Sequence, residues 1–204
     1  MKNYVITIGR EFGSGGPLIG KILAEKLGIK FYDAEIIELT AKKNNMKTSY
    51  VEEYDESMEE TIENKSILAA LKKNSIQDKL YKEEVEVIKD IASKESCVII
   101  GRCGNHILKD MKNAIHIFIY APYGFRFNRI SEVYPLTKEA TEKMISQVDK
   151  ARHDYYKRYT KTYRGDREGK HILMDSSLLG IQGTAEVLKQ IVIKRFSLDE
   201  KNNG

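Results

Sequence analysis

The sequence predicts an α/β fold, in which a five-stranded parallel sheet has helices on both faces. Three observations support this prediction: five short segments are almost continuously apolar, helix-like segments separate them, and glycines or polar residues follow them. Parallel strands need crossover connections and are buried on both faces, so they show continuous apolar runs rather than alternation. The residues that follow the strands are therefore expected to meet at the carboxyl edge of the sheet, where such folds bind ligands.

The composition agrees with a soluble globular chain. Of the 204 residues, 41% are apolar and 31% are charged, and a chain of this length buries roughly 70% of its extended surface. We expect one domain over residues 1–204. No run approaches the ~18 apolar residues of a membrane helix, and the first apolar run is too short for a signal peptide, which favours the cytoplasm. Cys97 and Cys103 have neither metal-ligand spacing nor a disulfide framework around them.

The first elements are predicted to be a strand, a glycine-rich loop and a helix. Tyr4–Ile8 is a β-branched run that stops at glycines, and the loop covers residues 9–16. After the loop, apolar residues recur at helical spacing from a start near Pro17, and Gly28 supplies a stop. Proline suits the first turn of a helix because the N–H that it lacks has no intrahelical partner there.

The loop carries the residues of an anion site. Gly13, Ser14, Gly15 and Gly16 can turn successive N–H groups inward at the start of the helix. The helix dipole favours negative charge at the same point. We therefore predict that these four residues bind the phosphates of a nucleotide.

The same loop lacks the lysine of the G-x-x-x-x-G-K-[ST] pattern. Gly16 occupies the lysine position and Pro17 the hydroxyl position, while a later Gly-Lys pair lies a turn inside the helix. Arg10, inside the loop, is the candidate substitute cation. Alternatively, Arg10 pairs with Glu11 or with another surface acid.

The remaining elements alternate between helix and strand. Residues 34–95 are highly charged and have apolar positions at intervals of three and four, which predicts helix. The other four predicted strands are Ile29–Asp33, Cys97–Gly101, His116–Ala121 and His171–Asp175. Because His116 and His171 lie inside these strands and the four histidines do not cluster, we expect structural histidines rather than ligands or bases.

Positive charge is concentrated in one third of the chain. Seven of the nine arginines lie between Arg102 and Arg167, although the formal net charge is only +4. Arginine suits bidentate phosphate binding, so this concentration indicates a polyphosphate or nucleic-acid partner. A solvated basic face is the alternative interpretation.

Aromatic residues accompany these cations between residues 154 and 167. Tyr155, Tyr159 and Tyr163 interleave with lysines and arginines, as in surfaces that stack single-stranded nucleic acid. The spacing of four is also that of a helix stripe that packs on the core. We favour the second interpretation.

The order of these segments resembles the cytidylate kinase-like family, a branch of the P-loop nucleoside monophosphate kinases. The matching segments are VITIGREFGSGGPLIGKILAEKLGIKFYD, CVIIGRCGNHIL, HIFIYAPYGFRFNRI, DKARHDYYKRYT and HILMDSSLLGIQ, and the resemblance extends from Tyr4 to about Val192. The REFGSGG and VIIGRC segments are its most specific parts. The family implies a parallel-sheet core (residues 1–33, 96–125 and 170–195), a helical acceptor-binding insertion (about 34–95) and an Arg-rich lid (about 126–169).

The resemblance also implies roles for individual residues. Asp33 matches an acid near the monophosphate nucleotide, and Arg102 matches the arginine of a D-G-R segment that grips the acceptor, with Ile100 in place of the aspartate. Asp149 and Arg152 match a D-x-x-R pair of the lid that touches the acceptor. The candidate catalytic residues are Arg10, Arg126, Arg129 and Arg152, and the candidate substrate-binding residues are Asp33, Arg102, Asp149 and Arg152.

The expected function is ATP-dependent phosphoryl transfer, with Mg²⁺, to a CMP-like nucleoside monophosphate or a related small acceptor. Such transfer needs positioned substrates and cations rather than covalent chemistry by the protein. Two alternatives stay open: a non-catalytic phosphate- or nucleotide-binding regulatory module, and a single-stranded nucleic-acid-binding protein. We expect nucleotide substrates as partners rather than nucleic acid or membrane, and no metal site built from the protein's own residues. The sequence leaves the acceptor and the oligomeric state open.

Overall fold

A computed structural model describes residues 3–33, 36, 39 and 67–198. At its centre lies a five-stranded sheet in the order β2-β3-β1-β4-β5, in which every neighbouring pair is parallel. The strands are β1 (Val5–Arg10), β2 (Lys30–Tyr32), β3 (Cys97–Ile100), β4 (Ala114–Tyr120) and β5 (Ile172–Asp175). The predicted parallel sheet is therefore confirmed.

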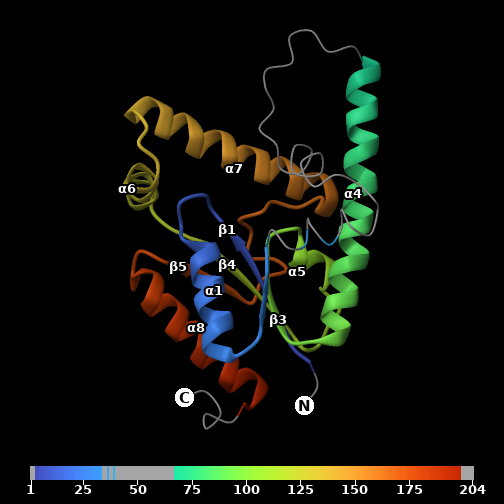
Figure 1. Cartoon of the computed structure of the whole chain (residues 1–204), viewed down its shortest axis with the longest axis vertical. Helices are drawn as coiled ribbons and strands as arrows, with labels where there is room; N and C mark the ends of the chain where they lie inside the picture. Colours follow the sequence, from blue (N-terminus) through green and yellow to red (C-terminus); the bar gives the residue numbers. More distant parts are fainter. Residues whose placement is uncertain (1–2, 34–35, 37–38, 40–66, 199–204) are drawn as a thin grey trace.

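Helices cover both faces of this sheet (Figure 1). On one face lie α1 (Gly16–Leu27) and α8 (Gly180–Phe196), and on the other lie α4 (Ile67–Lys94) and the short α5 (Gly104–Ile107). The remaining two helices, α6 (Tyr123–Val133) and α7 (Lys138–Thr160), extend across the carboxyl end of the strands. The predicted two-sided cover is confirmed, and α6 and α7 lie over the edge where this kind of fold binds ligands.

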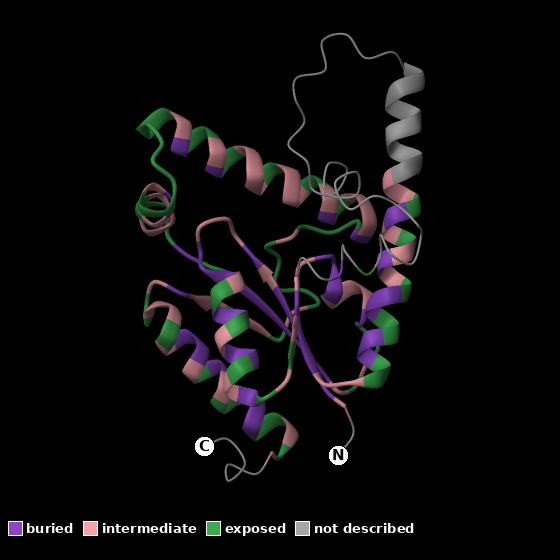
Figure 2. Cartoon of the chain, viewed as in Figure 1, coloured by how far each residue is buried: buried purple, intermediate pink, exposed green. Residues whose placement is uncertain are grey.

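Side-chain alternation along β1 divides the core into two layers. Ile6 and Ile8 are buried in the layer that contains α1 and α8, and Val5 is buried in the opposite layer with α4. Successive strand residues point to opposite faces, so Arg10 leaves the sheet on the face of Ile6 and Ile8, towards the start of α1. The three central strands β1, β3 and β4 are buried along most of their length, whereas the outer strands β2 and β5 are largely intermediate or exposed (Figure 2).

Strand pairing moves two of the predicted boundaries. The sequence predicts that the first strand ends at Ile8, whereas β1 continues to Arg10 because its last two residues pair with β4. β4 in turn begins at Ala114 rather than His116, because its first two residues pair with the start of β1. A local apolar pattern does not report a partner strand that lies far away in the sequence. β2 is one residue shorter than predicted at each end. The starts of β1, β5 and α1 and the ends of β3 and β4 also differ from the prediction by one residue.

The predicted helix over residues 34–95 is confirmed for the part that the structure describes. Residues 67–94 form α4, and most of the stretch before residue 67 lies outside the described residues. The predicted lid, about 126–169, contains most of α6 and all of α7. In the described ranges, no helix combines the length and the apolar character that crossing a membrane requires.

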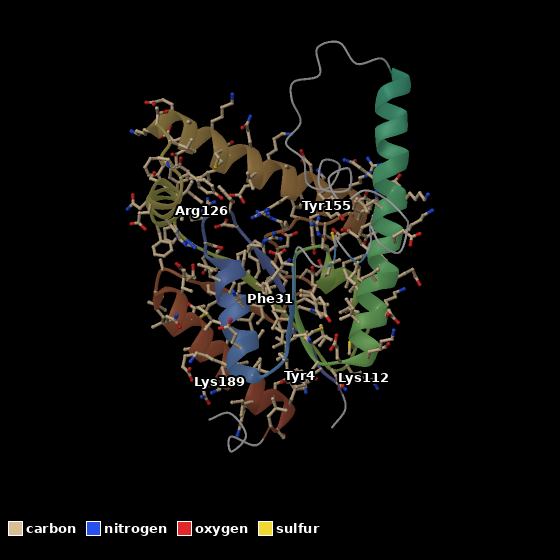
Figure 3. The ribbon with its side chains drawn as sticks, viewed as in Figure 1. Tyr4, Phe31, Lys112, Arg126, Tyr155 and Lys189 are labelled. Carbon is tan, nitrogen blue, oxygen red and sulfur yellow. The ribbon has the colours of Figure 1, made fainter. Side chains whose placement is uncertain are left out.

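The two halves of the sheet diverge at β1. β2 and β3 lie on one side of β1, and β4 and β5 lie on the other. Ligands bind beyond the carboxyl ends of the strands at such a switch point. Figure 3 shows Arg126 and Tyr155 at this end of the molecule, whereas Tyr4, Lys112 and Lys189 lie at the opposite end.

Candidate active site

The loop between β1 and α1 presents backbone donors at the start of α1. Gly13 and Gly15 both have a φ of 81°, a left-handed conformation that glycine adopts without strain. Among the described residues, their N–H groups have no hydrogen-bond acceptor. Ser14 is buried: its hydroxyl donates to the Glu11 carbonyl at 2.9 Å, and its carbonyl accepts from the Ser176 hydroxyl at 2.7 Å. The serine side chain therefore holds the loop, and the glycines leave donors of the kind that bind anions.

α6 packs directly on this loop. A Cβ on Gly13 would lie 2.9 Å from both the Cβ and the carbonyl oxygen of Arg126, so a larger residue would push α6 away. The Arg126 guanidinium donates to the Phe12 carbonyl at 3.1 Å and lies 3.4 Å from the Glu11 carboxylate. Arg126, predicted as catalytic, is thus occupied in holding the loop.

Asp149 joins the same loop to α7. Its carboxylate accepts from the Phe12 N–H at 2.9 Å, from Arg126 at 2.5 Å and from Arg164 at 2.7 Å. Burial by itself would raise the pKa of this carboxyl, but the Phe12 N–H and the two guanidinium groups outweigh burial and lower the pKa. The sequence assigns Asp149 and Arg152 to the acceptor, whereas the structure engages Asp149 with three donors of the protein itself.

Arg129 of α6 and Arg152 of α7 both approach the loop. The Nε of Arg129 lies 3.4 Å from the position of a Cβ on Gly15, is buried, and has no hydrogen-bond partner among the residues that the structure describes. The Arg152 guanidinium lies over the Phe12 ring, 5.6 Å from its centre, a separation typical of cation–π contacts. The structure therefore brings both predicted catalytic arginines next to the loop.

A cavity lies beyond the carboxyl ends of β1 and β3, with α7 in its wall. It encloses about 480 Å³ of space, part of it open to solvent. Among the described residues, its lining contains five cations and no carboxylate: Arg10, Arg102, Arg152, Arg164 and Lys170. Apolar, aromatic and neutral polar side chains complete the wall. Such an excess of positive charge in a concave site favours an anionic ligand.

Arg102 follows β3 and is buried in the wall of this cavity. Its Nε lies 3.4 Å from Glu84 of α4, which is fully buried and accepts a 2.6 Å hydrogen bond from Tyr155 of α7. Burial lowers the pKa of Arg102 to about 10; Tyr155 and Asp33 oppose this shift, and the nearby charge of Arg10 adds to it. The predicted substrate residues Asp33 and Arg102 thus lie close enough to interact electrostatically.

Arg10 occupies space that two glycines leave open. A Cβ on Gly16 would lie 2.5 Å from the Arg10 Cβ and 3.0 Å from its Cγ, and a Cβ on Gly101 would collide with an Arg10 guanidinium nitrogen. The side chain therefore runs past the start of α1 and ends beside the segment that follows β3. Arg10 is only 9% exposed, so its side chain lies inside the protein rather than on the surface.

The tyrosines of α7 pack on α4. Tyr155 and Tyr159 both contact Tyr81, and the rings of Tyr81 and Tyr159 are stacked with centroids 3.8 Å apart. Tyr163 is exposed. The interpretation of this spacing as a packed helix stripe is confirmed for the first two tyrosines, so the three rings do not form a common surface for bases.

The two strand histidines contact each other. The His116 ring is hydrogen-bonded to the Thr7 hydroxyl at 2.9 Å, and the His116 backbone N–H donates to the His171 ring at 2.9 Å. The two imidazole rings are stacked, with centroids 5.0 Å apart. Neither of these two histidines lines the cavity, and their partners in these contacts are Thr7 and each other.

Three residues of the site escape sequence reasoning. Arg164 and Lys170 belong to a stretch whose basic character is visible, but their place in the cavity depends on how the chain returns after α7. Glu84 is one of many acids in a charged helix, and no local signal distinguishes it from the exposed ones. The burial that sets it apart comes from α7 and from the segment after β3.

The parallel sheet, the glycine-rich loop after β1 and the cation-lined cavity together define an α/β protein with the fold of the P-loop kinases. A model of the cytidylate kinase-like family matches residues 5–178. The chain belongs to the cytidylate kinase-like family. The cytidylate kinase of Archaeoglobus fulgidus is 29% identical over 203 residues, a match that covers 96% of this chain and 99% of that protein.

Solved structures share the architecture. An uncharacterized protein from Eubacterium ventriosum ATCC 27560 matches with a TM-score of 0.68 and 26% identity, over 97% of this chain and 100% of that one. The shikimate kinase of Bacteroides thetaiotaomicron matches with a TM-score of 0.54 and 14% identity, over 96% and 99% of the two chains. The second similarity shows a common fold alone.

Proposed function

We propose that the protein transfers the γ-phosphoryl group of ATP to a nucleoside monophosphate, with CMP as the preferred acceptor. The observation that supports this most directly is the cation-lined cavity, which shares Gly9 and Arg10 with the glycine-rich loop of residues 9–16, here called the phosphate loop. A donor phosphate at the loop and an acceptor phosphate in the cavity would meet at the carboxyl end of β1. Phosphoryl transfer needs two anionic substrates in line and cations that neutralise the charge on the transferring group.

In the proposed reaction, an oxygen of the acceptor phosphate attacks the γ-phosphorus of ATP. The bond from that phosphorus to the β,γ-bridging oxygen breaks, its electron pair stays on ADP, and the acceptor becomes a nucleoside diphosphate. With fully ionised phosphates, substrates and products carry the same total charge, so the reaction requires no base. A site composed of arginines, without a histidine in its lining, suits this chemistry.

The loop, α6 and the segment after β5 would bind the donor. The N–H groups of Gly13 and Gly15 can donate to phosphate oxygens, and Arg129 adds a positive charge beside them. The segment after β5 is hydrogen-bonded to the loop and exposes Leu178 and Leu179. Exposed apolar side chains next to a phosphate site suit the flat face of a base.

The cavity would bind the acceptor. Arg102, Arg152 and Lys170 line the cavity and can meet the acceptor phosphate. Besides Glu84, whose carboxylate lies 3.4 Å from the Arg102 Nε, Asp33 also interacts electrostatically with Arg102. The proposal of CMP comes from the cytidylate kinase of A. fulgidus. Because Ile100 stands where the family has an aspartate, other residues must discriminate between bases.

The described residues fit a triphosphate better than a metal held by the protein. In the described ranges, no three His, Cys, Asp or Glu side chains come together as ligands. Pro17 and Leu18, which follow the loop, have no hydroxyl for a metal. Since Mg²⁺ commonly binds through substrate phosphates and waters, we propose that it enters with ATP rather than through a loop hydroxyl.

The test is turnover by the full-length chain. Mg-ATP is mixed with CMP, dCMP, UMP, AMP, GMP or shikimate in turn, and ADP and the phosphorylated product are separated by anion-exchange chromatography. We expect CMP-dependent formation of ADP and CDP at about 1–100 s⁻¹. Turnover of shikimate but of no nucleotide would contradict the assigned acceptor class.

Melting curves with the same ligands separate the alternatives, because a ligand that binds the native state raises the Tm. We expect ATP and CMP each to raise it, and an oligonucleotide to have no effect. Stabilisation by ATP without turnover of any acceptor would favour a regulatory module. Stabilisation by an oligonucleotide alone would favour a nucleic-acid-binding protein.

A further inference from the structure

We propose that Arg10 takes the place of the missing loop lysine and binds the phosphoryl group as it passes from donor to acceptor. This inference rests on the proposed function, because it assigns a role within that transfer. Its starting point is steric: the side chains of an arginine at position 10 and a lysine at position 16 cannot both be accommodated.

Backbone geometry directs Arg10 towards the lysine position. Arg10 is the last residue of β1 and projects on the face that α1 covers. Gly16, at the motif's lysine position, is the first residue of α1. A side chain from either position therefore enters the same space between the strand end and the helix start.

The surrounding glycines show that this space holds one side chain. A Cβ on Gly16 would lie 2.5 Å from the Arg10 Cβ. Both carbons are attached to the backbone, so neither can swing aside as a side-chain tip could. At the other end, Gly101 leaves room for the Arg10 guanidinium, which any Cβ at that position would displace. Gly16 and Gly101 are thus both accommodated to Arg10.

The guanidinium of Arg10 lies where the two substrates would meet. Arg10 is the last residue of the strand that leads into the phosphate loop, and it lines the proposed acceptor cavity together with Arg102 and Arg152. The charge of Arg10 disfavours the charged form of Arg102, as the lowered pKa of Arg102 reflects after the larger effect of burial. A phosphoryl group between the two arginines would relieve this repulsion.

Arginine at this position acts differently from a lysine on α1. Its guanidinium is a planar fork that stays charged and can bind two oxygens at once, whereas lysine is a point charge. From the end of β1, Arg10 would contact the equatorial oxygens of the γ-phosphoryl group. The bond to the bridging oxygen of ATP breaks and the bond to the acceptor oxygen forms, while Arg10 keeps its proton.

The first experiment removes or weakens this contact. Arg10→Ala, Arg10→Lys and a matched control, Arg195→Lys on the exposed surface of α8, are compared with the unmodified chain. We expect Arg10→Ala to lower kcat about 100- to 1000-fold, as for loss of one donor to a transition-state charge. By calorimetry it should weaken ATP binding about tenfold but change ADP binding by less than about twofold, because ADP lacks the γ-phosphate. Arg10→Lys should show smaller losses of kcat and of ATP affinity than Arg10→Ala. The control Arg195→Lys should show neither loss.

The second experiment exchanges the two positions. Gly16→Lys alone should lower the Tm and abolish turnover, since its Cβ meets Arg10. The double variant Arg10→Gly with Gly16→Lys removes the clash and restores the first glycine and the lysine of the motif, with Pro17 still at the hydroxyl position. We therefore expect a Tm above that of Gly16→Lys and kcat within about tenfold of the unmodified chain. A double variant that melts normally yet is as inactive as Arg10→Ala would contradict the exchange.

These outcomes separate this proposal from the proposed function. If the unmodified chain turns over CMP and Arg10→Ala keeps both kcat and ATP affinity, the role of Arg10 is wrong and the kinase function stands. If the unmodified chain turns over no acceptor, the kinase function is wrong. The calorimetry of Arg10→Ala against the unmodified chain then still tests the contact between Arg10 and the γ-phosphate. A loss of affinity for ATP but not for ADP supports the contact, and an unchanged ATP affinity in Arg10→Ala overturns it.

Discussion

The arginines of the site and the glycines around them form matched sets. Gly13 lies under Arg126, and Gly16 and Gly101 lie at the two ends of Arg10. In each case the missing Cβ is what lets the arginine approach. At close packing, a clash of a few tenths of an ångström must be relieved by moving one partner. The position of each cation therefore depends on the residue opposite as much as on the arginine itself.

Arg152→Ala is expected to lower kcat by about 100-fold and to leave ATP affinity within about twofold. The reason is that Arg152 lines the cavity proposed for the acceptor, and its guanidinium lies over the Phe12 ring of the loop. Steady-state kinetics with CMP and calorimetry with ATP measure the two quantities. Arg167→Ala, at an exposed position, is the control and should match the unmodified chain. A variant that weakens ATP and oligonucleotides alike, with no loss of kcat, would show that Arg152 belongs to a general anion face.

His116 is expected to make the fold sensitive to acid. Burial lowers its pKa from 6.5 to about 4, and the neighbouring His171 adds to the shift. Between pH 6.5 and about 4, His116 is therefore protonated in the unfolded chain but not in the folded one. The free energy of unfolding falls as the pH falls through this window. The loss is at most roughly 3 kcal/mol. Urea unfolding at pH 7, 5.5 and 4.5 measures it, and His116→Asn should have a flatter profile. An equal pH dependence in both proteins would assign the effect to other groups.

Among the helices, α7 makes the most varied contacts in the site. It begins after Thr137, whose hydroxyl accepts from the Ala140 N–H as a helix cap. Further along, Asp149 contacts the loop, Tyr155 contacts α4, and Arg158 is paired with Asp78 of α4 at 2.9 Å. One helix thus connects the phosphate loop with the helical region expected to bind the acceptor.

Tyr155→Phe is expected to lower the free energy of unfolding by about 1.5–3 kcal/mol. The Tyr155 hydroxyl donates to the fully buried Glu84 carboxylate. Burial and the nearby Glu84 raise the pKa of Tyr155 well above 10, so the hydroxyl keeps its proton at neutral pH. Urea unfolding measures the loss. Tyr163→Phe, on an exposed ring, is the control and should stay within about 0.5 kcal/mol of the parent. Equal stabilities for the two variants would mean that the hydroxyl contributes nothing to the tie between α4 and α7.

On the scale of the whole molecule, α6, α7 and the segment after α7 form a cover that is attached to the glycine-rich loop. Asp149 accepts from the loop, from α6 and from Arg164, which follows α7. Opening the cover would break these contacts together and separate opposite charges. Residues 150–170 carry eight Lys and Arg against three acids, so an open cover would be strongly positive. Phosphates in the cavity would offset this self-repulsion.

Asp149→Asn is expected to loosen the cover over residues 126–169. The change removes the negative charge that holds two guanidinium groups, so amide hydrogen exchange in α6 and α7 should quicken by about tenfold or more. ATP with CMP should slow exchange over the same residues in the unmodified chain, as expected for a lid that closes on both substrates. If exchange in the unmodified chain does not slow when both nucleotides are bound, the lid does not close on them. If exchange in Asp149→Asn is unchanged, the Asp149 contacts do not hold α6 and α7 on the loop.

The architecture was determined by the sequence itself. Short apolar runs predict buried parallel strands, and the glycines before Pro17 predict a tight loop at a helix start. These signals are local, since an apolar run or a glycine restricts the backbone wherever it lies. The same locality accounts for the tight loop with left-handed glycines at positions 13 and 15, and for the packed tyrosine stripe of α7.

The tertiary structure alone decided which charges work together. Arg126 and Arg129 are equivalent in the sequence, since they lie three residues apart on one helix. In the structure, Arg126 is hydrogen-bonded to Asp149, whereas the Arg129 side chain lies beside Gly15. The Asp149 contact to Phe12 joins residues 137 positions apart. Charge and hydrogen-bonding capacity are visible in a sequence, but the partner of a charged group depends on distance in space. Burial then decides whether such a pair is a surface contact or a fixed part of the site.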